Sequence, residues 1–88
     1  MPAAQRLNDK DSGGGAINSI PQGTVFINDQ LVSIDGSDVE GHGRHSPTKT
    51  ANGSPTVFVG NMPVNRQGDA DECGHTREDG SPNVFVGP

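Results

Sequence analysis

A short Phe-centred segment occurs three times in the chain and limits what it can fold into. Residues 24–28, 56–60 and 83–87 read TVFIN, TVFVG and NVFVG. Each copy is β-branched and bounded by Gly, Pro, Asn or Asp, a pattern typical of a short strand between turns. Three copies of one unit predict pseudo-threefold symmetry. The alternative is an ordinary meander with redundant hairpins.

The apolar content of the chain is too low for a conventional helical or α/β enzyme core. Ile, Val, Leu and Phe together supply 17 of the 88 residues, whereas Gly supplies 13 and Pro 7. No stretch of ten residues shows helical periodicity without a Gly or Pro break. We therefore predict one all-β domain over residues 1–88, without substantial helix. A metal or a partner is expected to add the stability that a thin core does not supply.

The predicted strands have two apolar faces, because Phe points to one side and the flanking Val or Ile residues to the other. One face can serve the core, and the other then forms a docking site; alternatively, the three strands pack on each other. A pseudo-threefold monomer is suited to a partner with true threefold symmetry. The candidate partner-binding residues are Phe26, Phe58, Phe85, Val57, Val59, Val84 and Val86.

The chain contains three histidines and one cysteine, and they form two close pairs. These residues are His42, His45, Cys73 and His75. Zinc prefers four tetrahedral N and S ligands, and a four-ligand site without an open position is structural. Cys73 and His75 would face the same side of a strand, and the glycines around His42 allow the chain to bend. We predict one structural zinc ion, with iron as the weaker alternative and unrelated exposed side chains as the remaining explanation.

Several function classes are excluded or disfavoured. The net charge is −5 and the six Lys and Arg residues are scattered, so nucleic-acid binding is not expected. The N-terminus has no apolar segment of a signal peptide. The run at 13–15 lacks the Lys-Ser/Thr of a phosphate-binding loop, so we interpret it as a flexible turn. We expect no catalytic residues and no small-molecule substrate. The acidic residues Asp69, Asp71, Glu72, Glu78 and Asp79 are expected in solvated turns.

The repeats resemble the PAAR-repeat family over essentially the whole chain. The Pro-Ala-Ala-Arg sequence that gives the family its name is present at 2–6, with Gln5 inserted, and in degraded form at 63–66. The second motif, Gly-Ser-Pro-x-Val-Phe-Val-Gly, occurs at 53–60 and 80–87. This resemblance implies a small conical β-prism with a zinc ion held near its vertex by three His and one Cys. Many members carry a His near the first glycine-rich turn. Residues 11–15 have none, so His42 and His45 together would replace it.

The resemblance also implies a mechanical function. Members of the family sit on the blunt end of a trimeric β-helical spike, one tip per trimer, and sharpen it for piercing the target membrane. Such spikes belong to phage tails and type VI secretion systems. Because no fused effector is visible, we expect a bare phage tail tip in the virion. The alternative location is a secretion apparatus assembled in the cytoplasm and delivered into the target cell. Alternative functions are a standalone zinc-binding adaptor and, less favoured, a hydrolase using Cys73 and His75 or a metal-bound water.

Overall fold

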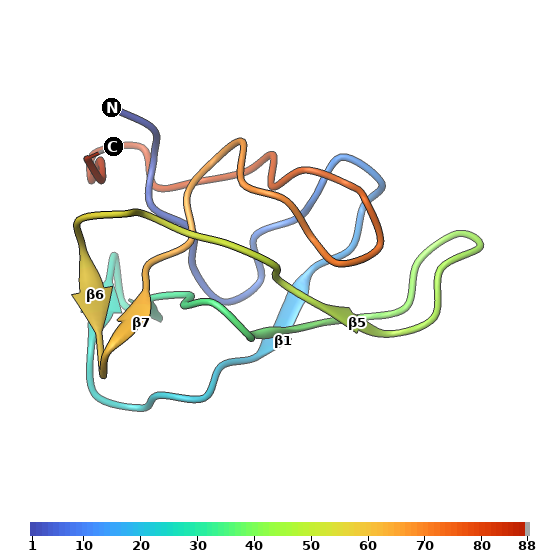
Figure 1. The fold of residues 1–88 in the computed structure, drawn as a ribbon, viewed down its shortest axis with the longest axis horizontal. Coiled ribbons are helices and arrows are strands. Elements are labelled where there is room, and N and C mark those ends of the chain that lie inside the picture. The colour runs from blue at the N-terminus through green and yellow to red at the C-terminus, as the bar shows by residue number, and fades with distance from the viewer. Residues whose placement is uncertain (88) are drawn as a thin grey trace.

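Seven short strands joined by turns make up the fold, which a computed structural model describes for residues 1–87 (Figure 1). The strands are β1 (Ile17–Ser19), β2 (Phe26–Ile27), β3 (Gln30–Leu31), β4 (Asp38–Val39), β5 (Thr48–Lys49), β6 (Phe58–Val59) and β7 (Met62–Pro63). The described residues contain no helix, and hence no helix that could span a bilayer. The prediction of an all-β fold of short hairpins is confirmed.

Two of the three Phe-centred segments form tight antiparallel hairpins, β2–β3 and β6–β7, with Phe26 opposite Leu31 and Phe58 opposite Pro63. Both turn residues in each hairpin have positive φ, 54° and 64° at positions 28 and 29, and 59° and 68° at positions 60 and 61. Asn, Asp and Gly tolerate this conformation, and such turns match the twist of the flanking strands. The turn chemistry therefore explains why the first two Val-Phe-Ile/Val runs are followed by Asn or Gly.

The third copy differs, because it pairs with the N-terminal segment instead of folding back on itself. Phe85 forms an isolated antiparallel bridge with Ala3. The Val86 N–H donates to the Pro2 carbonyl at 2.8 Å, and the Ala4 N–H donates to the Val84 carbonyl at 3.0 Å. The two ends of the chain thus complete the third unit together.

A closed ring of backbone hydrogen bonds lies at the centre of the molecule and establishes the pseudo-threefold arrangement. The Gln5 N–H donates to the Asn65 carbonyl at 3.0 Å, Asn65 to Ser33 at 2.9 Å, and Ser33 back to Gln5 at 2.9 Å. All three residues are fully buried. Antiparallel bridges on either side of the ring join the same three segments, which are 4–6, 32–34 and 64–66.

The apolar core around this ring is small. Its buried members are Ala4, Val32, Ile34, Val64 and Val86, against which Ile20, Ile27, Val59 and Val84 pack. A fully buried aliphatic side chain contributes about 1.5–3 kcal/mol. The buried polar and charged residues outnumber the buried apolar ones across residues 1–87, so the stability of the fold also depends on how these groups are paired.

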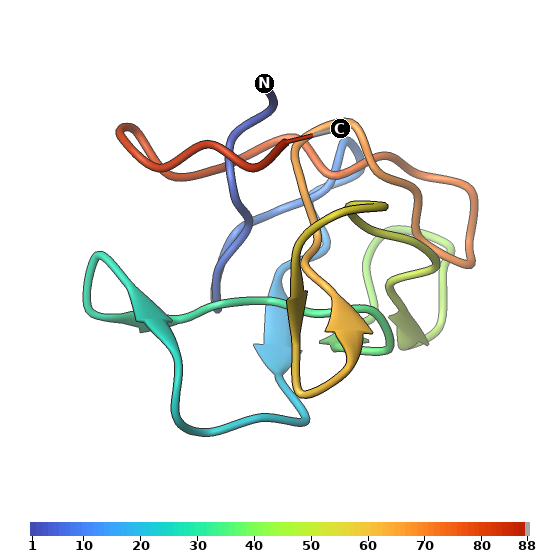
Figure 2. The same ribbon diagram turned by 60° about the vertical axis from the view of Figure 1, so that its left-hand side comes forward.

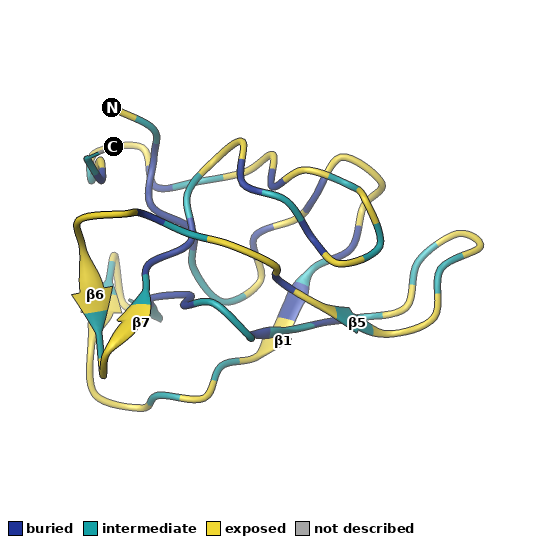
Figure 3. Ribbon diagram, in the orientation of Figure 1, coloured by how far each residue is buried: buried dark blue, intermediate teal, exposed yellow. Residues whose placement is uncertain are grey.

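The Phe-bearing hairpins and the His-bearing loops lie at opposite ends of the long axis. In Figure 1 the β6–β7 hairpin and the C-terminal segment lie at the left end, and the loop between β4 and β5 extends to the right. Figure 2 shows the two hairpins and the C-terminal segment as three separate projections. Figure 3 shows that burial is concentrated in the middle of the molecule, whereas the hairpins are largely exposed. The molecule measures 31 × 24 × 21 Å.

Candidate metal centre

Two loops bring together the four residues that the sequence analysis selected as ligands. One donor atom from each of His42, His45, Cys73 and His75 lies within 4.8 Å of all the others. The His42 Nε2 atom is 3.1 Å from His75 Nδ1 and 4.0 Å from Cys73 Sγ. Two donors on one tetrahedral ion, with bonds of about 2.0–2.3 Å, lie roughly 3.3–3.7 Å apart. The cluster therefore has dimensions that could hold one metal ion.

Cys73 and His75 converge through a turn, and the expectation that they lie on a strand is wrong. The Asp71 N–H donates to the His75 carbonyl at 2.8 Å, and the Gly74 N–H donates to the Asp71 carbonyl at 3.0 Å. Gly74 has a φ of 97°, a left-handed conformation that a strand does not contain. The tight turn brings both side chains close together. On a strand, the alternation of side chains would have placed them on the same face.

The second pair is held in a small loop of its own. His42 and His45 exchange two backbone hydrogen bonds, of 3.0 and 2.8 Å, and Gly43 between them has a φ of 57°. The His42 Nδ1 atom lies 2.8 Å from the Glu40 carbonyl, to which it can only donate. This hydrogen bond assigns the ring proton to Nδ1 and leaves the Nε2 lone pair directed at the cluster, as a metal ligand requires.

The first glycine-rich turn forms the floor on which the imidazole rings lie. A Cβ atom on Gly13 would come within 1.9 Å of His75 Cε1, and one on Gly15 within 2.5 Å of His42 Cε1. The turn at 11–15 repeats the backbone bonds of the turn at 71–75, with Asp11 N–H donating to the Gly15 carbonyl at 2.9 Å. Gly13 and Gly15 of the first repeat thus occupy the positions of Cys73 and His75 in the third. This turn is packed rather than merely flexible, and the residues fit a bound metal ion.

This packing predicts that Gly13→Ala lowers metal affinity without unfolding the protein. The added methyl group displaces the His75 ring, which is partly exposed and free to rotate away from the other donors. Displacing a ligand or its support typically costs about 10–100-fold in metal affinity. A competitive zinc titration measures the loss. Gly23→Ala is the matched control, because no heavy atom lies within 4 Å of its Cβ position; equal affinities for the two variants would contradict the prediction.

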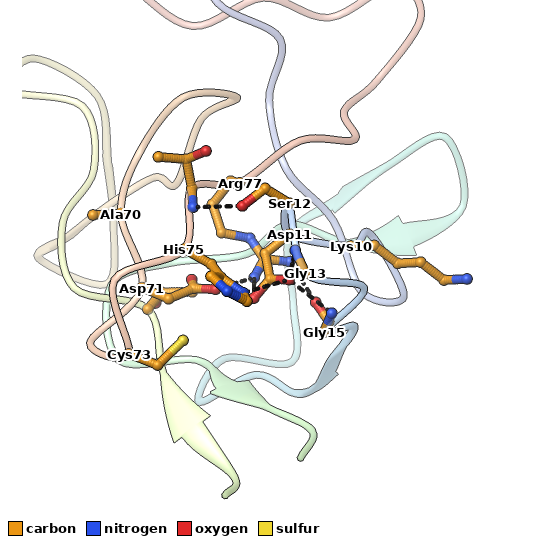
Figure 4. Close-up of polar contacts among 12 residues, drawn as sticks. Lys10, Asp11, Ser12, Gly13, Gly15, Ala70, Asp71, Cys73, His75 and Arg77 are labelled. Carbon is orange, nitrogen blue, oxygen red and sulfur yellow. Dashed lines mark hydrogen bonds and ion pairs between the residues drawn. The ribbon is translucent and has the colours of Figure 1, made fainter. Parts of the chain in front are cut away.

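A buried charged layer lies beneath the ligands, and the sequence analysis missed it (Figure 4). Arg77 is the largest fully buried side chain and pairs with Asp71 at 2.8 Å between Nη1 and Oδ2. Its guanidinium also donates to Gln5 Oε1 and to the Asp9 carbonyl, both at 2.7 Å. The expectation that Asp69 and Asp71 occupy solvated turns is wrong, because both are buried.

Two of these buried carboxyl groups interact and titrate in opposite directions. Burial, and then a hydrogen bond to Asp11, raise the pKa of Asp71 to about 7 against the opposing charge of Arg77. Burial acts to raise the pKa of Asp11 as well, but hydrogen bonds from Asp71, Gly15 and Gly13 outweigh it and lower that pKa to about 2. Asp11 is therefore the ionised partner at neutral pH.

The fold and the cluster define a small, pseudo-threefold, all-β metal-binding domain. The sequence pattern of the PAAR motif matches residues 7–76, and the chain belongs to the PAAR motif family. A comparison with curated proteins finds no match. The PAAR motif family is associated with the spike-tip proteins of contractile injection systems and is structural rather than enzymatic.

Proposed function

We propose that this protein caps and sharpens the trimeric β-helical spike of a contractile injection machine, one tip per trimer. The machine is a phage tail or a type VI secretion system. The tip contacts the target membrane transiently when the sheath contracts, and its role is mechanical. The observation that carries this proposal is that all three repeated Phe residues are about half exposed, while the segments that bear them lie at the opposite end of the molecule from the His-bearing loop (Figure 1).

This apolar surface consists of the three repeated Phe residues and the valines before two of them. Phe26, Phe58 and Phe85 are 57%, 52% and 53% exposed, so three related positions present nearly equal side-chain area. Val25 and Val57 are also exposed. Exposed apolar groups of this kind mark interaction sites, and a trimeric partner offers three equivalent places to receive them.

The other valines of the repeat face inward. Val86 belongs to the core, and Val59 and Val84 pack against it. In the proposed complex they support the exposed Phe side chains, so the contact with the spike is made by the three Phe residues together with Val25 and Val57.

For the other end we propose one structural zinc ion, with iron as the alternative, held by His42, His45, Cys73 and His75. When bound, the ion supplies crosslinks between the loop at 42–45 and the turn at 71–75. The Gly43 bend, the Glu40 carbonyl and the glycine floor hold the ligands in place before the ion binds. This arrangement supports a stiff end that resists unravelling under load.

Binding to a spike tests the proposal. Native mass spectrometry of the protein with the trimeric β-helical spike encoded in the same genome should give a complex of one tip per three spike chains. Phe58→Asp should weaken this complex at least tenfold, because truncating a buried anchor at an interface costs about 2 kcal/mol or more. Its fold should survive, since Phe58 is half exposed in the free protein.

Ser46→Asp is the matched control for this experiment. It adds the same single negative charge as Phe58→Asp, at an exposed position in the His-bearing loop. The control should bind the spike as the unmodified protein does. No complex with the spike, or the same loss of binding in both variants, would contradict the proposed function.

A further inference from the structure

A carboxylate from the first repeat lies against the metal-ligand cluster. Asp11 is only 1% exposed, and its turn at 11–15 is the one that carries no His or Cys ligand. The Asp11 Oδ2 atom is 3.2 Å from His42 Nε2, and its Oδ1 atom is 3.6 Å from His75 Nδ1. Both nitrogens are donor atoms of the cluster.

The Asp11 carboxylate is held in a fixed orientation. Its Oδ1 atom accepts hydrogen bonds from the Gly15 N–H at 2.7 Å and from the Gly13 N–H at 2.9 Å. Its Oδ2 atom accepts no hydrogen bond from an N–H group of residues 1–87. The nearest cation, Arg77 Nη1, is 3.8 Å away and donates to Asp71 instead. One oxygen is thus anchored, and the other is buried beside the cluster.

The contact between Asp11 and His42 is suited to a shared cation. In the neutral His42 ring, whose Nδ1 donates to the Glu40 carbonyl, Nε2 presents a lone pair to the Oδ2 atom 3.2 Å away. Two facing lone pairs in a buried place are unfavourable unless a positive charge lies between them. A separation of about 3.0–3.5 Å is the distance between adjacent donors that share one ion with bonds of roughly 2.0–2.2 Å.

The charges of the cluster indicate the same arrangement. A divalent ion with three neutral imidazoles and one thiolate keeps one positive charge, and a net charge partly removed from water is costly. Asp11 is the carboxylate that lies against His42 and His75 and can neutralise it. With Asp11 as a ligand, the ion and its ligands carry no net charge.

We propose that Asp11 is a fifth, carboxylate ligand of the metal ion, bound through Oδ2 beside His42, His45, Cys73 and His75. The proposal rests on the metal centre proposed above and does not depend on the spike. The site is then five-coordinate, with an oxygen donor.

The test uses cobalt(II) titration and X-ray absorption of the zinc form. The unmodified protein should give the weaker visible cobalt bands of a five-coordinate ion, and a zinc shell of five N/O/S donors. Asp11→Asn should change the spectrum to the intense bands of a tetrahedral site and weaken metal binding about 10–100-fold. Asp71→Asn is the matched control from the equivalent position in the third repeat, and it should keep five-coordination.

Each other result overturns the assignment in a distinguishable way. A four-donor zinc shell in the unmodified protein contradicts Asp11 as a ligand whether or not the variant folds. Identical cobalt spectra for Asp11→Asn and the unmodified protein contradict it as well. A change of coordination in Asp71→Asn alone would assign the fifth position to Asp71. Failure of the unmodified protein to bind cobalt or zinc would overturn the metal centre itself, and this inference with it.

Discussion

Removing the metal with a chelator is expected to lower the Tm of the protein by more than about 20 °C. Structural zinc contributes roughly 10–16 kcal/mol of binding free energy in small domains, and a chain of this size has a net stability of only about 4–13 kcal/mol. A loss of 5 kcal/mol alone shifts the Tm of such a domain by about 20–40 °C. The buried apolar cluster is too small to compensate. Circular dichroism melts with and without chelator measure the shift.

Two controls separate loss of the metal from other effects of the chelator. Adding excess zinc to the chelated protein should restore the original Tm. Cys73→Ala should already melt at the low temperature, and chelator should then change its Tm little. An unchanged Tm in the chelated, metal-free protein would show that the loops at the His-bearing end are stable without the ion.

The strands and the ligand set could be predicted from the sequence because both have strong local signals. Phe26 and Phe58 lie in β-branched runs followed by residues that favour positive φ, and each run forms the expected hairpin. The family and the pseudo-threefold ring follow from the same repetition. The cluster contains all the His and Cys residues of the chain, so composition alone selected its members.

The charged layer could not be predicted in the same way, because Asp and Arg are normally solvated and nothing local marks a buried pair. One signal was present: Asp11-Ser-Gly-Gly-Gly and Asp71-Glu-Cys-Gly-His occupy equivalent turns. Aligning the two turns places Gly13 at the position of Cys73. The alignment shows that the turn of the first repeat carries the carboxylate of Asp11 but no His or Cys. The turn geometry at Cys73 depended on Gly74, whose left-handed φ the strand interpretation ignored.

Arg77→Ala is expected to lower the free energy of unfolding by about 3–5 kcal/mol, which corresponds to roughly 12–40 °C in Tm. Removing one partner of a buried ion pair leaves an uncompensated charge and strands its hydrogen-bond acceptors. Arg77 is 1% exposed and pairs with Asp71, and its other bonds go to Gln5 and to backbone carbonyls. Denaturant unfolding at saturating zinc measures this effect with the metal site filled.

Arg66→Ala is the matched control, because it removes the same side chain from a comparable pair nearer the surface. Arg66 Nη2 lies 2.9 Å from Asp69 Oδ1, and its side chain stays 16% exposed. Because this pair keeps some contact with water, the carboxylate left behind by Arg66→Ala can be solvated more readily, so this variant should lose less stability. Equal losses in the two variants would mean that burial of Arg77 adds nothing to its pairing. A much larger loss for Arg77→Ala would show that the acid pair next to the metal ligands depends on this one cation. The end of the molecule that bears the ligands would then be stabilised by two positive charges, the metal ion and the Arg77 guanidinium.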